Sequence, residues 1–439
     1  MTTTDKPETE ARRLSREIFL DVAAAVDGAA LVRGAAAAGA VAAATHVLAI
    51  GKVAFPMLMG ATEGVRPGGA PRPTLAIAPG PRVPAEKDVP AGVQVAPADH
   101  PQPTARSVAA GQAALSFVRA LTPSDRLLVL LSGGGSSLMC LPAPGLTLEE
   151  KRAATGAVSR GGASITMLNA VRKHLSAIKG GRLALESRAP VTVLAISDVI
   201  GGEPATIASG PFSPDPTTYA DALAAVAQTK AVLPATARQH LERGLRGELP
   251  ETPKPGDPRL RHVTWTAVAG PDRVPAEARR AAGERGLQTG ALSRDAEEDV
   301  DTLAAAYLER ARVEMSAGGA RRVLIGNGEP TIKVGADAGK GGRSTHLALA
   351  MARGLGQLPP ELQGRVAFLA AGTDDRDGDT PASGGLVDGT TWARIRAAGL
   401  DPQKALDRWD SYTALAAVGD TVTGPGTSNV LDLHLLLVS

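Results

Sequence analysis

The most distinctive chemical motif in this sequence is a run of glycines flanked by serines. Glycines let the backbone approach a ligand closely, and successive main-chain amides can form a nest that binds an anion. A helix that starts near the end of the run would add its dipole to the same site. The alternative interpretation is a tight strand-to-helix turn with serine caps. The motif consists of Ser132, Gly133, Gly134, Gly135, Ser136 and Ser137.

This glycine motif is neither a Walker loop nor the nucleophile elbow of a hydrolase. No Gly-Lys-Ser or Gly-Lys-Thr follows it, and Leu138 stands where the closing glycine of the elbow belongs. The motif therefore indicates an anion site of another kind.

A lysine follows a buried apolar run at Gly51-Lys52. Most lysines are solvated surface charges, but this one lies between apolar segments. A positive charge at that position is suited to face a phosphoryl group during its transfer.

Two basic segments follow further along the chain. Helical spacing over residues 169–182 predicts that Arg172, Ser176 and Lys179 share one face, either as a solvated surface or as a clamp for an anionic substrate or nucleotide phosphates. Arg343 follows two glycines and precedes Ser344-Thr345, which fits an anion site at a helix start or plain N-capping.

Carboxylates also follow apolar runs. Asp198 comes directly after one of them, so it is a candidate Mg²⁺ ligand or the base that takes a proton from an attacking hydroxyl. Glu329 and Asp374 occupy similar positions. The acidic stretch 374–379 is also compatible with a turn capped by aspartates, but not with an EF-hand, because Asp375, Asp377 and Asp379 would place Thr380, followed by Pro381, where the loop glycine belongs.

These residues need elements that bring them together, and five short apolar runs provide them. Continuous runs of Val, Ile and Leu predict strands buried on both faces, as in a parallel sheet. In open α/β sheets, ligands bind beyond the carboxyl ends of such strands. An enzyme is therefore expected. The runs are Val47–Ile50, Leu127–Leu131, Val191–Ile196, Val323–Ile325 and Val366–Ala370.

The overall composition excludes several classes of function. The 439 residues carry a formal net charge of only +2, so there is no bulk electrostatic reason to bind nucleic acid or an anionic membrane. The single Cys140 excludes an intramolecular disulfide and a multi-cysteine zinc site, and it fits a reducing cytosol. The first ten residues lack the pattern of a signal peptide. We expect a cytoplasmic enzyme, a monomer or homodimer, that acts on small molecules.

The chain length predicts two domains. Strand and helix patterns alternate up to about residue 245, and a proline-dense, polar segment follows at 248–258. We expect a domain over residues 13–250 and a second over residues 259–439. The second would begin with a strand near His262 and contain a long helix from Ala296 to Met315.

Taken together, these motifs resemble the class II glycerate 2-kinase family, the MOFRL-domain kinases that were long labelled hydroxypyruvate reductases. The resemblance runs from about Ile50 to Leu433 and covers most of the chain. Its ordered matches include 51–52, 99–101, 132–137, 169–184, 197–211, 215–218, 328–331, 341–343, 372–374 and 423–429.

The resemblance implies an α/β fold: a Rossmann-like domain with a parallel sheet, then a smaller α/β domain with a mixed sheet and an active site in the cleft between them. The implied reaction transfers the γ-phosphoryl group of ATP to the 2-hydroxyl of D-glycerate, with Mg²⁺, and gives 2-phospho-D-glycerate. By position, Lys52 and Arg343 match the catalytic cations of the family, and Asp198 matches its aspartate.

The chain departs from the family pattern in two places. Ser344, Thr345 and His346 replace Asn-Gln-Glu after the arginine, and Asp375 stands where the family prefers glycine. A kinase of another small hydroxy acid is therefore one alternative, and a non-catalytic metabolite-binding homologue is another. An NAD(P)H-dependent hydroxypyruvate reductase is the third, although no Gly-x-Gly-x-x-Gly with a following acidic residue occurs.

Overall fold

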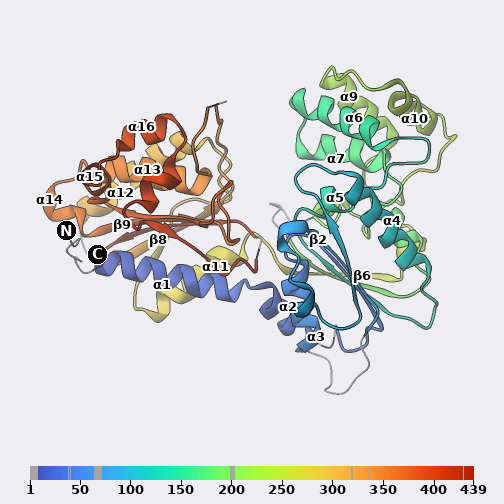
Figure 1. Ribbon diagram of the computed structural model, residues 1–439, viewed down its shortest axis with the longest axis horizontal. Helices are drawn as coiled ribbons and strands as arrows, with labels where there is room; N and C mark the ends of the chain where they lie inside the picture. The colour runs from blue at the N-terminus through green and yellow to red at the C-terminus, as the bar shows by residue number, and fades with distance from the viewer. Residues whose placement is uncertain are drawn as a thin grey trace. The chain divides into compact units, whose positions relative to one another are not determined.

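A computed structural model describes residues 8–37, 39, 41–63, 72–197, 203–317, 320–335, 337–428 and 430–439 (Figure 1). The chain divides into two compact units. One comprises residues 31–268, and the other combines residues 1–30 with residues 269–439. We call them the first-sheet unit and the second-sheet unit.

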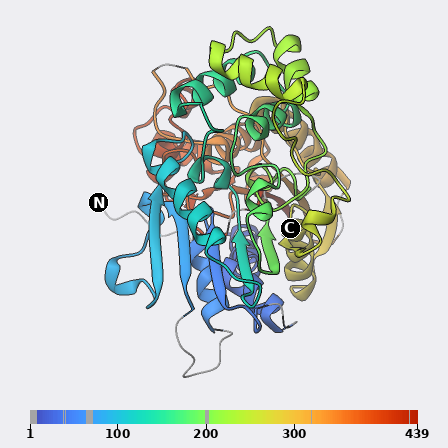
Figure 2. The same ribbon diagram turned by 90° about the vertical axis from the view of Figure 1, so that its right-hand side faces the viewer.

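The described residues of the first-sheet unit form a six-stranded sheet in the order β3-β2-β1-β4-β5-β6. The pairs β1–β2, β1–β4, β2–β3 and β4–β5 are parallel, and Figure 2 shows the strands side by side. This is the strand order of a Rossmann fold, which reverses direction between β1 and β4. The fold class predicted from the sequence is confirmed. The strands are β1 (His46–Ile50), β2 (Thr74–Pro79), β3 (Val93–Ala98), β4 (Leu127–Leu131), β5 (Val191–Ile196) and β6 (Val263–Ala269).

Helices cover this sheet and also form a separate layer. α3 packs against β1, β2 and β4, and α4 packs against β2 and β3. A second apolar cluster joins α6, α7, α9 and α10, which gather at one end of the unit in Figure 1. The helices are α2 (Gly28–Ala37), α3 (Ala54–Glu63), α4 (Ala105–Arg119), α5 (Gly135–Leu138), α6 (Leu148–Arg160), α7 (Ile165–His174), α8 (Arg182–Leu185), α9 (Tyr219–Gln228) and α10 (Ala235–Leu245), with 3₁₀ turns η1 (Gly80–Arg82), η2 (Glu86–Asp88), η3 (Ile207–Ser209) and η4 (Pro258–Leu260).

The second-sheet unit contains a mixed sheet in the order β11-β10-β9-β12-β8-β7. The strand β12 runs antiparallel to both of its neighbours, β8 and β9, whereas β7 and β8 are parallel. All five apolar runs named above are strands, but two of them, β8 and β9, flank an antiparallel partner. The strands are β7 (Gln288–Ala291), β8 (Arg322–Gly328), β9 (Val366–Ala371), β10 (Gly384–Asp388), β11 (Thr421–Val422) and β12 (Asp432–Val438).

Helix α13 is the central helix of this unit. It packs against β9, β10 and α12, and its residues Leu347–Ala352 are fully or almost fully buried. The long helix expected from Ala296 begins four residues later, because the preceding segment is extended and bridges to Gly328 and Thr331. The helices are α1 (Glu10–Ala25), α11 (Arg273–Glu284), α12 (Val300–Ala317), α13 (Arg343–Leu355), α14 (Pro360–Gln363), α15 (Thr391–Ala397), α16 (Pro402–Asp407) and α17 (Ser411–Ala416).

The observed division differs from the expected domain limits at both ends. Helix α1 packs on β9, β10, β12 and α11 through its apolar stripe, so it belongs to the second-sheet unit. Strand β6 lies at the edge of the first sheet beside β5, and its Trp265 donates a hydrogen bond to the carbonyl of Phe212 at 3.1 Å. Its alternation of polar and apolar residues suits an edge strand with one exposed face.

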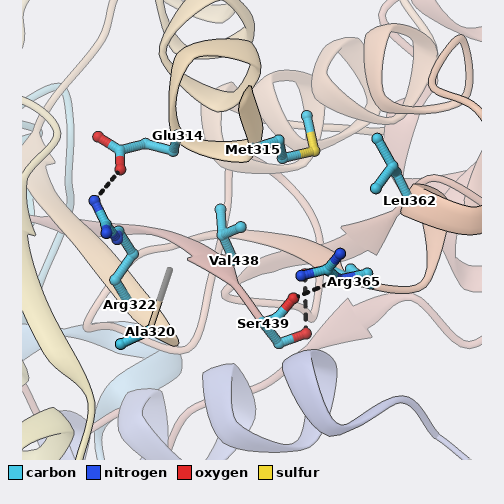
Figure 3. A pocket seen from close by; sticks show the side chains of 8 residues that line it. All are labelled: Glu314, Met315, Ala320, Arg322, Leu362, Arg365, Val438 and Ser439. Atoms are coloured by element: carbon cyan, nitrogen blue, oxygen red, sulfur yellow. Dashed lines mark hydrogen bonds and ion pairs between the residues drawn. The ribbon is translucent and has the colours of Figure 1, made fainter. Parts of the chain in front are cut away.

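A small pocket lies at the end of the second sheet where β8 begins and β12 ends (Figure 3). Arg322 and Glu314 form an ion pair at 2.8 Å on its wall, and Arg365 donates to the carbonyl of Ser439 at 2.7 Å. This pocket is separated by the length of β8, roughly 20 Å, from the polar residues at the other end of the sheet. Of the helices that the structure describes, none is long and apolar enough to cross a membrane.

Candidate active site

The loops after β1 and β4 are joined by hydrogen bonds at the point where the strand order reverses. The amide of Lys52 donates to the carbonyl of Gly133 at 2.9 Å, and the amide of Ser132 donates to the carbonyl of Ile50 at 2.9 Å. Parallel pairing of the two strands brings their carboxyl ends together, so Lys52 lies beside the serine–glycine loop, residues 132–137. This position is where open α/β sheets bind ligands.

The turn after β1 uses its own amides within the protein. The amide of Gly51 donates to Ile77, that of Lys52 to Gly133, and that of Ala54 to Gly51. The amide of Val53 donates to the hydroxyl of Ser132 at 3.3 Å. No amide of residues 51–54 therefore remains for a ligand.

The serine–glycine loop differs from that turn in the state of its amides. Within the described part of the chain, the amides of residues 133–136 donate no hydrogen bond to a protein acceptor outside α5. The first residues of a helical turn have no partner within the turn either. Four successive main-chain donors are thus available to an anion, as the glycine pattern predicts.

Two glycines of the loop permit close packing. A Cβ on Gly135 would lie 2.9 Å from the Cβ of Ala208, so a side chain there would displace the loop. Gly134 has a φ of +82°. A Cβ on it would lie 3.1 Å from Cγ of Lys52 and 3.0 Å from Cδ2 of His100, which shows that these side chains flank the loop. Loss of hydration and the charges of Lys52 and Arg82 lower the pKa of His100 to about 4, so its ring is neutral at pH 7.

Lys179 lies beneath the loop and is 1% exposed. Its ammonium donates to the carbonyl of Ser136 at 2.9 Å, to the Ser136 hydroxyl at 3.2 Å and to the carbonyl of Ala208 at 3.3 Å. The prediction that Arg172, Ser176 and Lys179 share a helix face is wrong, because α7 ends at His174. The chain leaves the helix there since Leu175 and Ala177 pair with the segment 141–143.

A chain of polar contacts leads from the loop to Arg172. The hydroxyls of Ser136 and Ser209 are 2.9 Å apart, and Ser209 donates to Oδ1 of Asn169 at 3.1 Å. Arg172 donates to the same oxygen at 3.5 Å. Ser209 has a φ of 60°, in the left-handed region that costs energy for a residue with a side chain. The sequence position of Ser209 or Asn169 does not mark either residue as part of a site. The one signal is that both lie within the motifs 169–184 and 197–211.

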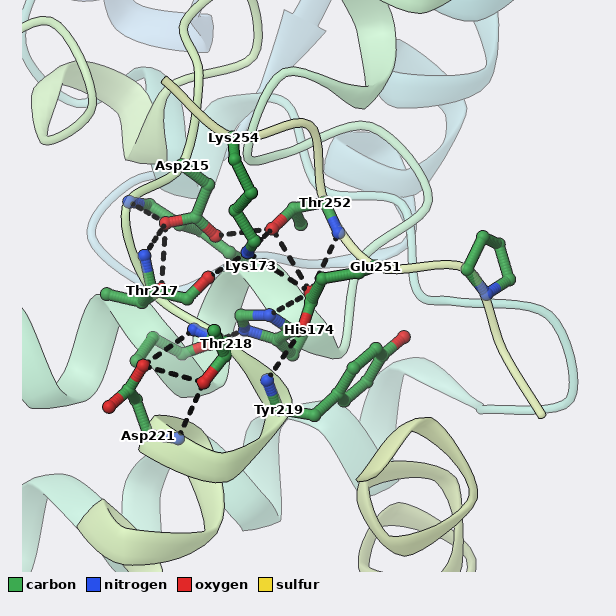
Figure 4. Close-up of polar contacts among 12 residues, drawn as sticks. Lys173, His174, Asp215, Thr217, Thr218, Tyr219, Asp221, Glu251, Thr252 and Lys254 are labelled. Atoms are coloured by element: carbon green, nitrogen blue, oxygen red, sulfur yellow. Dashed lines mark hydrogen bonds and ion pairs between the residues drawn. The ribbon is translucent and has the colours of Figure 1, made fainter. Parts of the chain in front are cut away.

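The proline-dense segment 248–258 belongs to a buried polar network in the first-sheet unit and is not a free connector (Figure 4). Lys173 and Asp215 form an ion pair at 3.0 Å, and both side chains are almost fully buried. Thr252 donates to the same carboxylate at 3.1 Å, and Glu251 contacts His174 at 2.8 Å. These contacts tie the segment to α7, which explains why the unit continues beyond residue 250.

Asp198, the predicted metal ligand or base, lies outside the described residues. Among the described residues, no group of three or more His, Cys, Asp or Glu is arranged to hold a metal ion. The magnesium site therefore stays a prediction. Arg343, the second of the predicted catalytic cations, lies within the described residues.

Arg343 is held by two carboxylates at the start of α13. Its Nε and Nη2 donate to the two oxygens of Asp432 at 2.6 and 2.9 Å, and Nη2 also donates to Glu329 at 2.9 Å. Burial alone would lower the pKa of Arg343, but the charges and hydrogen bonds of the two carboxylates outweigh it and raise the pKa. Burial would raise the pKa of Asp432, but the charge and the hydrogen bonds of Arg343 outweigh this effect, so the pKa of Asp432 is lowered overall.

The strand directions explain this arrangement. Asp432 is the first residue of β12 and pairs with Gly328, the last residue of β8. An antiparallel strand thus brings its beginning to the ends of β8 and β9, where Glu329 and Asp374 follow. Asp432 is not among the residues predicted from the sequence, because it stands at the start of an apolar run, whereas the predicted residues follow the end of one.

Asp377 caps helix α13. Its carboxylate accepts from the amides of Ser344 at 3.0 Å and Thr345 at 2.7 Å, which neutralises two unpaired donors of the helix. Burial raises the pKa of Asp377 to about 6 even though these hydrogen bonds lower it. Ser344 donates through its hydroxyl to Asp432 at 3.0 Å. One residue of the acidic stretch 374–379 is thus a helix cap. Because the carboxylate of Asp377 is used in this way, we assign it no contact with a substrate.

The carboxylates of Asp374 and Asp432 lie close together beside Gly372. A Cβ on Gly372 would be 3.0 Å from Oδ1 of Asp374 and 3.3 Å from Oδ1 of Asp432. Asp374 is half-buried, and Asp432 already binds Arg343 and Ser344. The second-sheet unit therefore gathers Arg343, Glu329, Asp374 and Asp432, and the first-sheet unit gathers Lys52 with the serine–glycine loop.

Comparison with known proteins identifies two regions of the chain. A domain of unknown function, DUF4147, matches residues 15–242, and the MOFRL family matches residues 322–432. The two matches fall mainly on the first-sheet unit and the second-sheet unit, respectively.

Several relatives match over most of their length. The glycerate 2-kinase of Pyrococcus horikoshii is 35% identical over 79% of this chain and 78% of its own. The D-glycerate 2-kinase of Thermotoga maritima is 38% identical over 78% of this chain and 79% of its own. A protein of Agrobacterium vitis named "Putative hydroxypyruvate reductase" is 40% identical over 80% and 78%. The crystal structure of glycerate kinase from Thermotoga maritima superposes with a TM-score of 0.83 at 31% identity and covers 98% of this chain and 99% of the other.

Proposed function

This chain belongs to the family of MOFRL-domain glycerate kinases, and we propose that it transfers the γ-phosphoryl group of ATP to the 2-hydroxyl of D-glycerate. In this reaction the substrate oxygen forms a bond to phosphorus, the bond between the β- and γ-phosphates breaks, and the hydroxyl proton leaves. The products are ADP and 2-phospho-D-glycerate. Relatives named glycerate 2-kinase, which match about four fifths of the chain, support the assignment.

The observation that carries the proposal is the arrangement at the switch point of the first sheet. The serine–glycine loop offers the amides of residues 133–136, and Lys52 lies beside it. Phosphoryl transfer requires little covalent chemistry from the protein and depends on positioning and on stabilising negative charge. Main-chain donors and an ammonium at one strand edge provide both.

Arg343 supplies a second cation, with a fixed orientation. Two hydrogen bonds to Asp432 hold the plane of the guanidinium, and the planar group can still use its remaining donors toward an oxyanion. We assign Arg343 to the charge that develops during transfer. Glu329 and Asp374 are assigned to binding beside it, and an active site to which both units contribute stays a prediction.

Asp198 keeps the two roles predicted for it, Mg²⁺ ligand or base for the substrate hydroxyl. Mg²⁺ in kinases is commonly held by one or two carboxylates together with the phosphates of the nucleotide, and it neutralises charge on the phosphate oxygens. We infer that ATP binds with Mg²⁺ and that the enzyme is cytoplasmic, in keeping with its single, free Cys140. We retain the monomer or homodimer as a prediction.

The test is a reaction of the purified protein with ATP, Mg²⁺ and a panel of small hydroxy acids. ADP release is measured for each acid, and ³¹P and ¹H NMR give the position of the phosphate in the product. We expect the highest kcat/KM with D-glycerate and phosphorylation at the 2-hydroxyl. A larger kcat/KM for another hydroxy acid would correct the substrate, which the residues Ser344-Thr345-His346 make worth testing. No ADP release with any acid would contradict the kinase assignment and favour a metabolite-binding homologue.

The hydroxypyruvate reductase alternative is disfavoured by the turn after β1. In a Rossmann dinucleotide site, the amides of this turn bind the pyrophosphate. Here the amides of residues 51–54 all donate to protein oxygens. Incubation with hydroxypyruvate and NADH or NADPH should therefore show no loss of absorbance at 340 nm.

A further inference from the structure

Lys179 uses all of its donors within the protein. An ammonium has three N–H groups, and Lys179 directs them at three oxygens, two of Ser136 and one of Ala208. The side chain is buried beneath the serine–glycine loop. Direct contact with a substrate, which the sequence pattern suggests, would require it to give up these hydrogen bonds.

The charge of Lys179 has no carboxylate partner among the described residues. Lys173, six residues earlier and equally buried, forms an ion pair with Asp215 at 3.0 Å. Lys179 instead meets carbonyl and hydroxyl oxygens, and its charged neighbours include the cations Lys151 and Arg172. Burial, with the repulsion of these cations, lowers its pKa to about 7. Burying a cation without an anion among the described residues is costly, and of the two lysines buried in this way, Lys151 and Lys179, it is Lys179 that donates to the serine–glycine loop.

The contacts of Lys179 connect two segments that shape the loop. Ser136 belongs to the loop itself, and Ala208 belongs to the left-handed turn 208–210, against which Gly135 packs. The amides of residues 180 and 181 donate to the carbonyls of residues 209 and 210, which fixes the backbone of the lysine against the same turn. The ammonium therefore lies between the loop and the turn 208–210.

We propose that Lys179 is a positioning residue for oxyanion binding: it fixes Ser136 so that the loop amides are directed at the anion, and its buried charge is balanced when that anion binds. The inference rests on the proposed function, because it takes the loop to hold an oxyanion of a substrate. That oxyanion is either a phosphate of the nucleotide or the carboxylate of the hydroxy acid. Both have the same chemistry for the loop.

The test uses Lys179→Met, with Lys151→Met as the matched control. Lys151 is also buried and donates to the carbonyls of Arg172 and Leu175 at 3.3 and 2.9 Å, but none of its hydrogen bonds reaches the loop. Circular dichroism and thermal unfolding establish that each variant is folded. Calorimetry then measures the affinities for ADP and for D-glycerate separately.

We expect Lys179→Met to lose about tenfold or more in affinity for one of the two ligands and less than about threefold for the other, which is the range of a hydrogen bond to a charged group. A loss for ADP places a nucleotide phosphate at the loop, and a loss for D-glycerate places the carboxylate there. Lys151→Met should keep both affinities within about twofold. A merely structural role of Lys179 would lower thermal stability without separating the two affinities.

If Lys179→Met does not fold, Lys179→Gln carries the test, because its amide keeps a donor near Ser136 without the charge. The same selective loss of affinity is expected. Wild-type affinity for both ligands in a folded Lys179 variant, or equal losses in the Lys151 control, would overturn the proposal. Calorimetry needs no turnover, so a wild-type protein that binds ADP but phosphorylates no hydroxy acid would contradict the proposed function alone.

Discussion

The two sheets present opposite kinds of polar group at the edges where their candidate residues lie. The first sheet ends in main-chain amides and a buried lysine that is coordinated by neutral oxygens. The second sheet ends in a guanidinium whose single positive charge is already paired with two carboxylates. The first edge gains most from an incoming anion, whereas the second holds one cation in a defined orientation. Phosphoryl transfer needs both, a site that binds negative charge and a cation fixed in advance.

The difference follows from strand direction. Parallel β1 and β4 bring two glycine-containing turns together, and of these the turn after β4 leaves main-chain donors for a ligand. Antiparallel β12 brings the beginning of a strand between the ends of β8 and β9, so an acidic side chain arrives beside the arginine. If this comparison is correct, substitutions at the two edges have effects of different size and kind.

Replacement of Lys52 should have the largest effect. The variant Lys52→Ala removes a cation beside the loop amides, and loss of one well-placed transition-state donor costs on the order of 10²–10³ in kcat. Steady-state ADP release gives the loss, and circular dichroism shows that the fold remains. Lys87→Ala, at an exposed lysine of the same unit, is the control and should keep wild-type activity. Activity near the wild-type level in Lys52→Ala would remove the first edge from the mechanism.

Asp432→Asn should have the next largest effect, on orientation. The variant keeps an acceptor for Arg343 but loses the charge, and hydrogen bonds between charged groups are worth about 1.5–3 kcal/mol. We expect kcat to fall about tenfold to a hundredfold, with a smaller change in KM. Asp388→Asn, at a buried carboxylate 3.4 Å from Arg12 in the same unit, is the control for stability. An equal loss of kcat in both variants would mean that lower stability of the second-sheet unit, and not a changed orientation of the Arg343 guanidinium, is responsible.

Glu329→Gln should have a smaller effect than Asp432→Asn. The side chain of Glu329 is 45% exposed, compared with 5% for Asp432, and exposed ion pairs are worth about 0.2–1 kcal/mol. We expect kcat/KM to change by less than about fivefold. A loss as large as that of Asp432→Asn would show that Glu329 acts on the substrate itself, beyond its ion pair with Arg343.

The last prediction concerns a different quantity, the dependence of stability on pH. The pKa of Lys179 is about 7 in the folded protein and 10.5 ordinarily, so between these values the unfolded chain binds more protons at this lysine. The free energy of unfolding should therefore rise from pH 7 to about pH 10.5 by a contribution that Lys179→Met lacks. Urea unfolding of both proteins at pH 7 and pH 9.5 measures the difference, and Lys151 contributes to both. A difference that is independent of pH would show that the burial of the charge is not costly.

Much of the fold could be predicted because the relevant patterns are local. Each of the five apolar runs is a strand, and Lys52 and the glycine motif follow two of them that pair. Strand direction is not local, so the arrival of Asp432 next to Arg343 could not be read from the apolar run that it begins. The expected domain limits differed for the same reason, since β6 continues the first sheet and α1 packs on the second.

The candidate site was predicted in its residue types more than in its contacts. Arg172 and Lys179 were grouped by helical spacing, but α7 ends at His174 and Lys179 turns beneath the loop. Asp377 could be placed in a turn but not recognised as the cap of α13, because a cap depends on a helix start more than thirty residues earlier in the chain. Long-range hydrogen bonds of this kind decide which charged residues face a ligand.

The central claim is that the amides of the loop after β4 bind an oxyanion while those of the turn after β1 do not. ¹H–¹⁵N spectra of the protein labelled at glycine and serine, recorded with increasing ADP, D-glycerate or inorganic phosphate, test it directly. We predict that the amide signals of Gly133, Gly134, Gly135 and Ser136 move with at least one of these ligands, whereas that of Gly51 moves less. Large shifts at Gly51 with none at residues 133–136 would contradict the account.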